Sequence, residues 1–212
     1  MMRILALSTL LVVVPPFQSS IRPLPPPVRT ELTGPFWHAG CPVPLSRLRL
    51  VSVSHWDFNG QVQTGQLVVN QSVAVPLTKV FRRLYRLRFR IRHLQLSDAY
   101  GPKSARPPDR DVSGSFECRR AVPSPCSGGR STGTWSEHAY GRAVDLNPIE
   151  NPYVGCGRSR ERASLPYFDR SRLRRGMVTP PVVQAFRSIG WGWGGDWSGG
   201  TKDYMHFSAS GH

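Results

Sequence analysis

Two short stretches, far apart in the chain, each pair histidine with aspartate, and together they place the strongest constraint on the fold. The first is Ser-Glu-His-Ala-Tyr-Gly-Arg-Ala-Val-Asp (136–145) and the second is Asp-Tyr-Met-His-Phe (203–207). His138, Asp145 and His206 have the type and number of a catalytic zinc site, which takes three protein ligands and leaves a fourth position to water. A site of this kind requires the fold to bring the two stretches together.

Asp203 lies three residues before the last of these ligands, where a general base could act on that water. Two imidazoles favour zinc over calcium or magnesium, which prefer all-oxygen shells. Iron(II) also binds to two histidines and one carboxylate, so an iron centre stays open at this point, as does a chain without metal.

The chain has 212 residues, which predicts one folded domain. Residues 1–20 are interpreted as a signal peptide or an N-terminal anchor, because Arg3 precedes an apolar run at 4–14 that is too short to span a bilayer. We therefore expect a secreted, extracytoplasmic protein that reaches a membrane only if this segment stays uncleaved. Ser19-Ser20 is a candidate cleavage site.

The net charge of +15 predicts attraction to anionic polymers such as nucleic acid, acidic lipid or bacterial cell wall. Charge alone does not choose among them. No nucleic-acid-binding motif is recognised in the sequence, which argues against nucleic acid as the partner.

Four cysteines, none in a C-x-x-C pair, argue against a structural Cys₄ zinc site. In an oxidising compartment they can form two disulfides in three pairings. Cys118–Cys126 would close a short loop and Cys126–Cys156 would join two loops. The sequence leaves the pairing of these three cysteines with one another and with Cys41 open.

Residues 21–40 are interpreted as a Pro-rich linker, and residues 41–212 as the folded domain. Runs rich in β-branched residues at 50–58 and 61–69 predict a hairpin, with Asn59-Gly60 as a type I′ turn. Apolar residues at spacings of three and four predict a helix over 76–87, and alternation then predicts a strand over 88–96.

The C-terminal half is predicted to contain a short strand at 115–120, loops at 101–114, 123–133 and 155–176, and a helix at 179–189 that Thr179 caps and Gly190 ends. Alternation at 143–147 predicts a strand from which Asp145 points away from Val144 and Leu146. This order of elements predicts a single α+β domain with a mostly antiparallel sheet flanked by helices.

The pattern Ser136-x-His138-x-x-Gly141-x-Ala143-x-Asp145, with Asp203-x-x-His206, resembles the zinc D-alanyl-D-alanine carboxypeptidase family. That family also holds vancomycin-resistance D,D-dipeptidases and phage L-alanyl-D-glutamate endolysins, and its fold is shared with the hedgehog signalling domain. The resemblance covers about residues 40–207. It implies one zinc ion held by His138, Asp145 and His206, with Asp203 as the base, a position where many relatives have Glu and the endolysin branch has Asp.

The family also has an arginine upstream of the first ligand that stabilises the oxyanion. Arg119 is the choice here, with Arg120 as the alternative, and Glu117 departs from the asparagine of the endolysin branch. The substrate-binding residues expected from the motifs are Ser136, Trp193, Asp196 and Trp197, with core packing as the alternative for the tryptophans. The histidines without partners at metal spacing are expected to lie outside the site, and these are His38, His55, His93 and His212.

We therefore expect a secreted, monomeric zinc peptidase that acts on peptidoglycan stem peptides. D-alanyl-D-alanine carboxypeptidase activity is the first prediction, and L-alanyl-D-glutamate endopeptidase activity is the second. A non-catalytic, zinc-containing module that binds cell wall is the alternative outside the enzymes.

Overall fold

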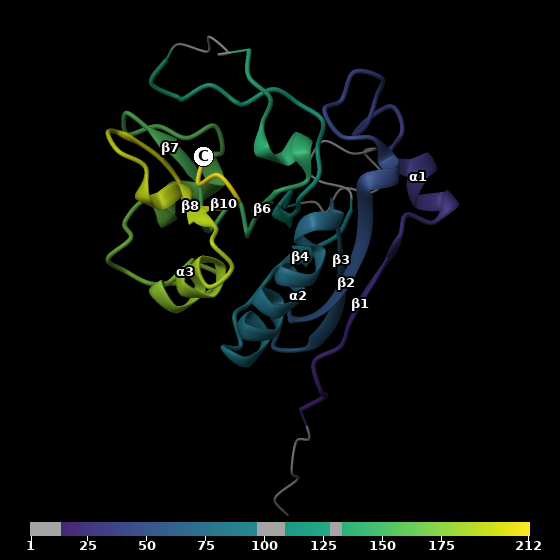
Figure 1. Ribbon diagram of the computed structural model, residues 1–212. Coiled ribbons are helices and arrows are strands. Elements are labelled where there is room, and N and C mark those ends of the chain that lie inside the picture. Colours follow the sequence, from purple (N-terminus) through teal and green to yellow (C-terminus); the bar gives the residue numbers. More distant parts are fainter. Residues whose placement is uncertain (1–13, 97–108, 128–132) are drawn as a thin grey trace, which may run out of the picture.

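The structure, a computed structural model, describes residues 14–96, 109–127 and 133–212. Most of the predicted leader, and most of the loop predicted at 101–114, lie outside these ranges. The described chain combines two three-stranded antiparallel sheets with two main helices (Figure 1), which confirms the α+β class. No helix in the described ranges is long and apolar enough to cross a bilayer.

The largest sheet has the order β1-β2-β3 and is built on the predicted hairpin, β2 (Leu48–Trp56) and β3 (Val62–Asn70). The turn is longer than predicted, because Trp56 pairs with Val62 and five residues lie between them. The Asp57 carboxylate closes this loop by accepting hydrogen bonds from the backbone N–H groups of Asn59 and Gln61, at 2.9 and 2.8 Å. The two-residue type I′ turn is therefore wrong, although Gly60 does adopt a positive φ of 85°.

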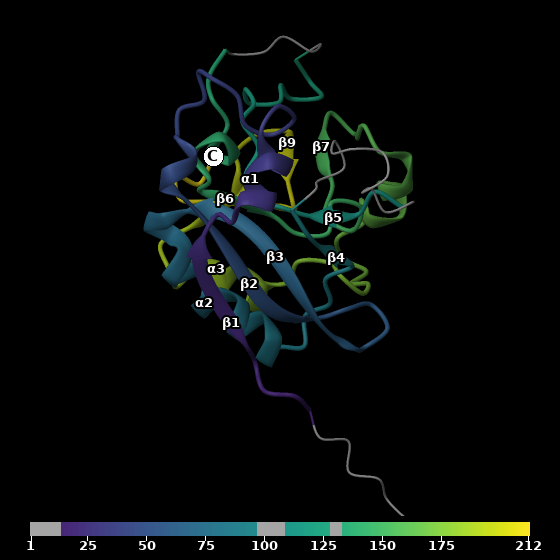
Figure 2. The ribbon, with the colours of Figure 1, turned by 90° about the vertical axis from the view of Figure 1, so that its right-hand side faces the viewer.

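Helix α2 (Gln71–Arg86) follows β3 directly and begins five residues before the predicted start. Asn70 caps it, since its side-chain oxygen accepts from the backbone N–H of Ser72 at 3.1 Å. The apolar face of the helix packs on the sheet, while its arginines face solvent, as the periodicity predicted. Figure 2 shows the three strands in front of this helix.

The interpretation of residues 21–40 as a linker is wrong. β1 (Ser19–Pro23) pairs antiparallel with β2, and it includes the predicted cleavage site at Ser19-Ser20. α1 (Pro26–Leu32) follows, and its Leu32 is buried with Phe36 against the second face of the sheet. The prolines were interpreted as signs of an extended linker. Three apolar side chains of this segment, Leu24, Leu32 and Phe36, are instead buried, and their burial stabilises the packing of the segment on the sheet.

The second sheet has the order β6-β10-β8, from β6 (Ala143–Asp145), β10 (His206–Ser208) and β8 (Gly192–Trp193). Helix α3 (Pro180–Arg187) lies where the sequence predicted a helix and packs beside α2 (Figure 1). One hydrophobic core joins the two halves, because Phe186 of α3 stacks on Phe207 of β10 while both share a cluster with α2 and the hairpin. A shared core makes this a single domain.

Two short strand pairs complete the fold beside this sheet. β4 (His93–Leu94) pairs parallel with β5 (Val112–Ser113), and β7 (Tyr153–Gly155) pairs antiparallel with β9 (Thr201–Asp203). The predicted strand at 88–96 therefore shrinks to two residues, and the strand predicted at 115–120 forms instead at 112–113. Within the described ranges, four 3₁₀ turns link these elements: Leu45–Arg47, Glu137–Tyr140, Arg162–Tyr167 and Gly194–Asp196.

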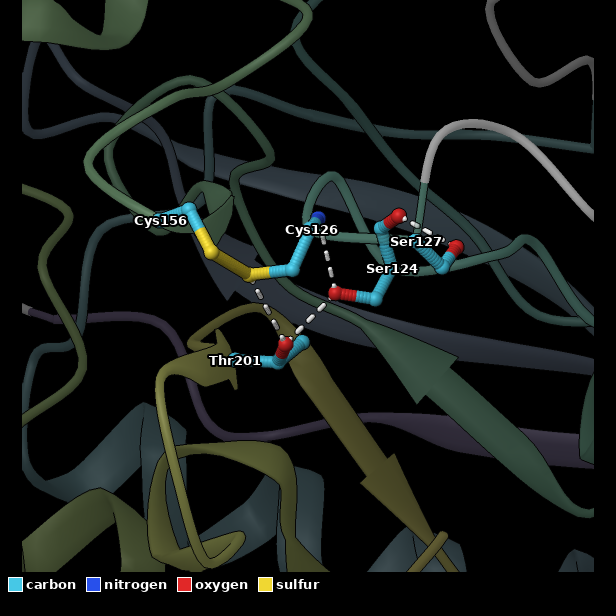
Figure 3. The surroundings of a disulfide bond; sticks show 5 residues. All are labelled: Ser124, Cys126, Ser127, Cys156 and Thr201. Carbon is cyan, nitrogen blue, oxygen red and sulfur yellow. Dashed lines mark hydrogen bonds between the residues drawn. A yellow bond between two sulfur atoms is a disulfide. The ribbon is translucent and has the colours of Figure 1, made fainter.

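Two disulfides fasten the loops, Cys41–Cys118 and Cys126–Cys156. The second confirms one predicted pairing, and the pairing of Cys118 with Cys126 is wrong. Cys118 lies with Phe36 in the cluster on the outer face of the first sheet, so it meets Cys41 from the N-terminal segment. Figure 3 shows the second disulfide beside Thr201 of β9, whose hydroxyl lies 2.6 Å from that of Ser124.

Candidate metal centre and active-site cavity

Pairing between β6 and β10 places two of the predicted ligands side by side. Asp145 is the last residue of β6 and His206 is the first residue of β10, and the two are direct partners in the antiparallel register. His138 comes from the 3₁₀ turn Glu137–Tyr140, for which Ser136 is the N-cap. Gly141 ends this turn with a φ of 64° and leaves no room for a Cβ against the backbone of Asn70. Because Asn70 is the last residue of β3, this close packing against the hairpin fixes the position of the turn that carries His138.

The three side chains converge on one point. His138 Nε2 lies 3.1 Å from Asp145 Oδ2, and His206 Nδ1 lies 3.0 Å from Asp145 Oδ1. The two imidazole nitrogens are 3.2 Å apart. Ligand atoms at about 2.0 Å from a tetrahedral zinc ion are separated by roughly 3.3 Å. The spacing of this trio therefore fits a four-coordinate ion.

Hydrogen bonds on the far side of each ring orient the two imidazoles. His138 Nδ1 donates to the carbonyl oxygen of Ser115 at 2.5 Å, which leaves Nε2 with its lone pair. His206 Nε2 donates to the carbonyl oxygen of His212 at 3.3 Å, which leaves Nδ1 with its lone pair. Both lone pairs then face the carboxylate of Asp145, and one bound cation satisfies all three groups. The residues present fit a metal ion.

The pKa values of the two aspartates at the site are shifted in opposite directions. Burial opposes the charge of Asp145, but the imidazoles of His138 and His206 outweigh it and hold the pKa of Asp145 well below its usual range. Burial raises the pKa of Asp203 to about 7, and the negative charge of Asp145 adds to this. Asp145 is therefore an anionic ligand, whereas Asp203 can exchange a proton near neutral pH.

Asp203 lies at the end of β9, opposite Tyr153 of β7. Its Oδ1 is buried and has no hydrogen-bond partner among the described residues. Gly194 lies against it so closely that a Cβ there would be 2.4 Å from the Asp203 carbonyl oxygen. A buried carboxylate oxygen without a partner, held beside the ligand trio, is available to a water molecule or a substrate.

A cavity of about 690 Å³ opens over this centre. Its wall includes all three predicted ligands together with Asp203 and Arg119. Arg119 donates from Nε to Glu117 at 2.6 Å, and its charge reaches Asp203, whose pKa it lowers. Arg120 instead stacks over the ring of Trp135 and donates to the carbonyl oxygen of Gly133, outside the cavity wall. The structure thus separates the two arginines that the sequence left as alternatives.

The four expected substrate-binding residues divide into two pairs. Trp197 lines the cavity, and Ser136 does so too, although its hydroxyl is engaged as the acceptor of the His138 backbone N–H at 3.3 Å. Trp193 is not in the cavity wall, because its indole donates to the Tyr204 carbonyl and packs on Phe207. Asp196 is also outside the wall, and its carboxylate accepts from Arg187 at the surface.

Sequence reasoning missed several residues that shape the centre. Ser115 supplies the carbonyl that orients His138, and a carbonyl leaves no signal in a side-chain motif. His212 was expected to lie outside the site, yet its carbonyl accepts from His206 and it lines the cavity. Tyr153 lies opposite Asp203 through the β7–β9 pairing, which is a tertiary contact. His38, His55 and His93 do not line the cavity.

Metal-dependent hydrolases use a His-Asp-His trio of this kind beside a further carboxylate in a cavity. Residues 129–209 match the model of a protein family described as D-alanyl-D-alanine carboxypeptidase. The match includes both motifs, confirms the resemblance over residues 129–209 and supports a peptidase. Comparisons with curated proteins and with solved structures give no significant match.

Proposed function

We propose that this protein is a zinc-dependent peptidase that hydrolyses the stem peptides of peptidoglycan. The observation that carries the proposal is the convergence of His138, Asp145 and His206, with ligand atoms 3.0 to 3.2 Å apart, beside a carboxylate whose pKa is about 7. The family match supports the peptidase chemistry. Zinc is favoured among metals because two imidazoles and one carboxylate form the ligand set.

His138, Asp145 and His206 would hold a zinc ion, which would supply a Lewis acid that makes a water molecule nucleophilic near neutral pH. Asp203 accepts a proton from that water as it attacks the peptide carbonyl, and then gives the proton to the leaving amine. Arg119 lines the cavity, with its Nε bound to Glu117 and its Nη1 3.4 Å from the Arg120 carbonyl oxygen, and its guanidinium donates to the developing oxyanion. Asp203 and Arg119 both line the cavity, which supports these roles.

Release of the terminal D-alanine is the first substrate proposal, since the matching family is described by this activity. L-alanyl-D-glutamate endopeptidase activity is the second, and the aspartate at the base position favours it. A non-catalytic wall-binding module would need the metal trio but no base. Asp203 lines the same cavity and its buried Oδ1 has no partner among the described residues, so it provides a base and argues for an enzyme.

We further propose that the protein works outside the cytoplasm as a monomer, either released or held by its N-terminal segment. Two disulfides within a single small domain support an oxidising compartment. The net charge of +15 is complementary to an anionic cell wall.

Digestion of purified muropeptides, with products read by mass spectrometry, tests the proposal. Loss of a D-alanine mass would identify the carboxypeptidase, and cleavage after L-alanine would identify the endopeptidase. Parallel reactions with a chelator, and with chelator followed by added zinc, test the metal. The Asp203→Asn variant is the control for contaminating hydrolases. No cleavage by zinc-replete protein would rule out both enzyme assignments.

A further inference from the structure

Two arginines on the wall of the cavity, Arg110 and Arg160, have no role in the chemistry described above. Both are exposed and both line the cavity that holds the metal centre. Within the described parts of the chain, neither side chain has a hydrogen-bond or ion-pair partner. Two unpaired cations beside a catalytic site attract an anionic group, and a guanidinium binds a carboxylate through two parallel hydrogen bonds.

Three glutamates on the same wall already have other partners, and the two aspartates on it, Asp145 and Asp203, lie at the metal centre. Glu117 accepts from Arg119, and Glu137 accepts from Arg142 at 3.2 Å. The side chain of Glu161 caps the backbone N–H of Ala163 at 3.3 Å. The positive charge at this part of the cavity is therefore left for a ligand.

The two acidic neighbours of Arg110 in the sequence pair with another arginine, so they do not engage the Arg110 side chain. Asp109 and Asp111 flank it, and both turn to Arg92, with Asp111 fully buried at 2.9 Å from the Arg92 Nε. Arg110 itself has a φ of 55°, a left-handed conformation that is strained for a residue with a Cβ. Strain of this kind persists where neighbouring contacts impose it, and it clusters at functional positions.

The residues that follow Arg110 in the sequence form hydrogen bonds to two of the predicted metal ligands. Gly114 forms paired backbone hydrogen bonds with Asp145, and Ser115 holds His138. Gly114 is the fourth residue after Arg110, so their Cα atoms are at most about 14 Å apart. A peptide of a few residues, cleaved at the centre, can reach this arginine.

Arg160 approaches the centre from the other side. Its charge acts on Tyr153, whose pKa burial and Asp203 raise and Arg160 lowers. Tyr153 is the strand partner of Asp203. Arg160 follows Cys156, which the second disulfide ties to Cys126, so the segment that carries it is covalently anchored.

We propose that Arg110 and Arg160 recognise a free carboxylate of the peptide substrate, so that the enzyme selects stem peptides by their anionic groups. The inference rests on the proposed peptidase function and deepens it. A stem peptide offers two such groups, its terminal carboxylate and the α-carboxylate of a D-glutamate linked through its side chain. Both have the same chemistry, and selective amidation distinguishes them.

The test measures kcat and KM for Arg110→Gln, Arg160→Gln and the double variant. The substrates are a synthetic stem pentapeptide, its C-terminal amide and its D-glutamate α-amide. Arg83→Gln, an equally exposed arginine on α2 away from the cavity, is the matched control. With wild-type protein, we expect one of the two amides to have a KM about tenfold higher than that of the free acid. The amide with the higher KM identifies the carboxylate that the arginines bind. Each cavity variant should raise the KM of the free acid about tenfold, with kcat within twofold, and leave the amide unchanged.

Replacement by lysine keeps the charge and should restore part of the discrimination between acid and amide, which a purely structural role would not predict. Calorimetric binding of the same peptides to Asp203→Asn protein, with and without each arginine, gives a second readout. If wild-type protein cleaves peptides but the arginine variants keep the acid-to-amide ratio, the inference fails and the proposed function stands. If wild-type protein neither binds nor cleaves them, both fail.

Discussion

The ring of His138 is held from behind by Ser115, whose carbonyl oxygen accepts from Nδ1 at 2.5 Å. Ser115 is in turn fixed, because its hydroxyl donates to the Ala143 carbonyl of β6 at 2.6 Å. The same strand ends in Asp145. One strand therefore carries the ligand Asp145 and, through Ser115, also fixes the ring of the ligand His138. Outer contacts of this kind set ring orientation and metal affinity.

We expect His206→Ala protein to lose its bound zinc and its peptidase activity together, because two remaining ligands bind zinc far more weakly than three. Metal content per chain after dialysis, by elemental mass spectrometry, would fall from about one to near zero. His93→Ala is the control, since His93 pairs with Asp109 away from the cavity wall, and it should keep its zinc. Full zinc occupancy in the His206 variant would contradict the ligand set.

Asp203→Asn is expected to keep zinc and lose turnover, since the amide cannot accept a proton from water. A positioned general base contributes roughly 10²–10⁴-fold, so kcat should fall within that range. Asp196→Asn is the matched control, because Asp196 forms a surface ion pair with Arg187, and its kcat should stay within twofold. A kcat in Asp203→Asn close to wild type would remove the assigned base.

Arg119 and Arg120 are adjacent in sequence but differ in position, which makes them a natural comparison. Arg119→Gln should lower kcat by about 10²-fold, the loss of one oxyanion donor. Arg120→Gln removes the stacking on Trp135 and should change kcat by less than threefold, with its effect on stability instead. Steady-state kinetics and thermal melts of the two variants separate these effects. Equal losses of kcat would argue against a special role for Arg119.

His55 should make stability depend on pH. It is buried in β2, and burial lowers its pKa from 6.5 to about 4. The unfolded chain therefore binds more protons than the folded chain between about pH 4 and 6.5, so folding loses stability as the pH falls through that window. The loss reaches about 3 kcal/mol below pH 4. Urea unfolding of His55→Gln across this range should show a smaller loss than wild type, and parallel curves would contradict the prediction.

The second disulfide should stabilise the fold and the cavity wall. It closes a loop across a sequence separation of 30, for which loop entropy predicts about 3–4 kcal/mol. Cys126→Ser/Cys156→Ser protein should unfold at lower denaturant concentration by that amount. Its activity should also fall, because the closed loop includes Tyr153, which lines the cavity as the strand partner of Asp203 and donates a hydrogen bond to the Val122 carbonyl oxygen. Unchanged stability would show that this link is dispensable.

The sequence predicted the elements whose signals are local. Apolar spacing found α2 and α3, and β-rich runs found the hairpin, because amphipathic periodicity records which face is buried. The start of α2 was missed because Asn70 belongs to both a strand and a cap. The N-terminal segment was misread because its prolines indicate extension, whereas docking depends on a partner surface that the segment itself does not contain.

The sequence by itself determined the ligand types, since residue chemistry at His138, Asp145 and His206 is written in two motifs. Only the tertiary structure decided how those groups meet, because the β6–β10 register joins segments about sixty residues apart. It also decided that Arg119 rather than Arg120 faces the cavity, and that Trp197 rather than Trp193 lines it. The physical reason is the same in each case: side-chain chemistry is carried by single residues, but direction, burial and distance are set by long-range packing.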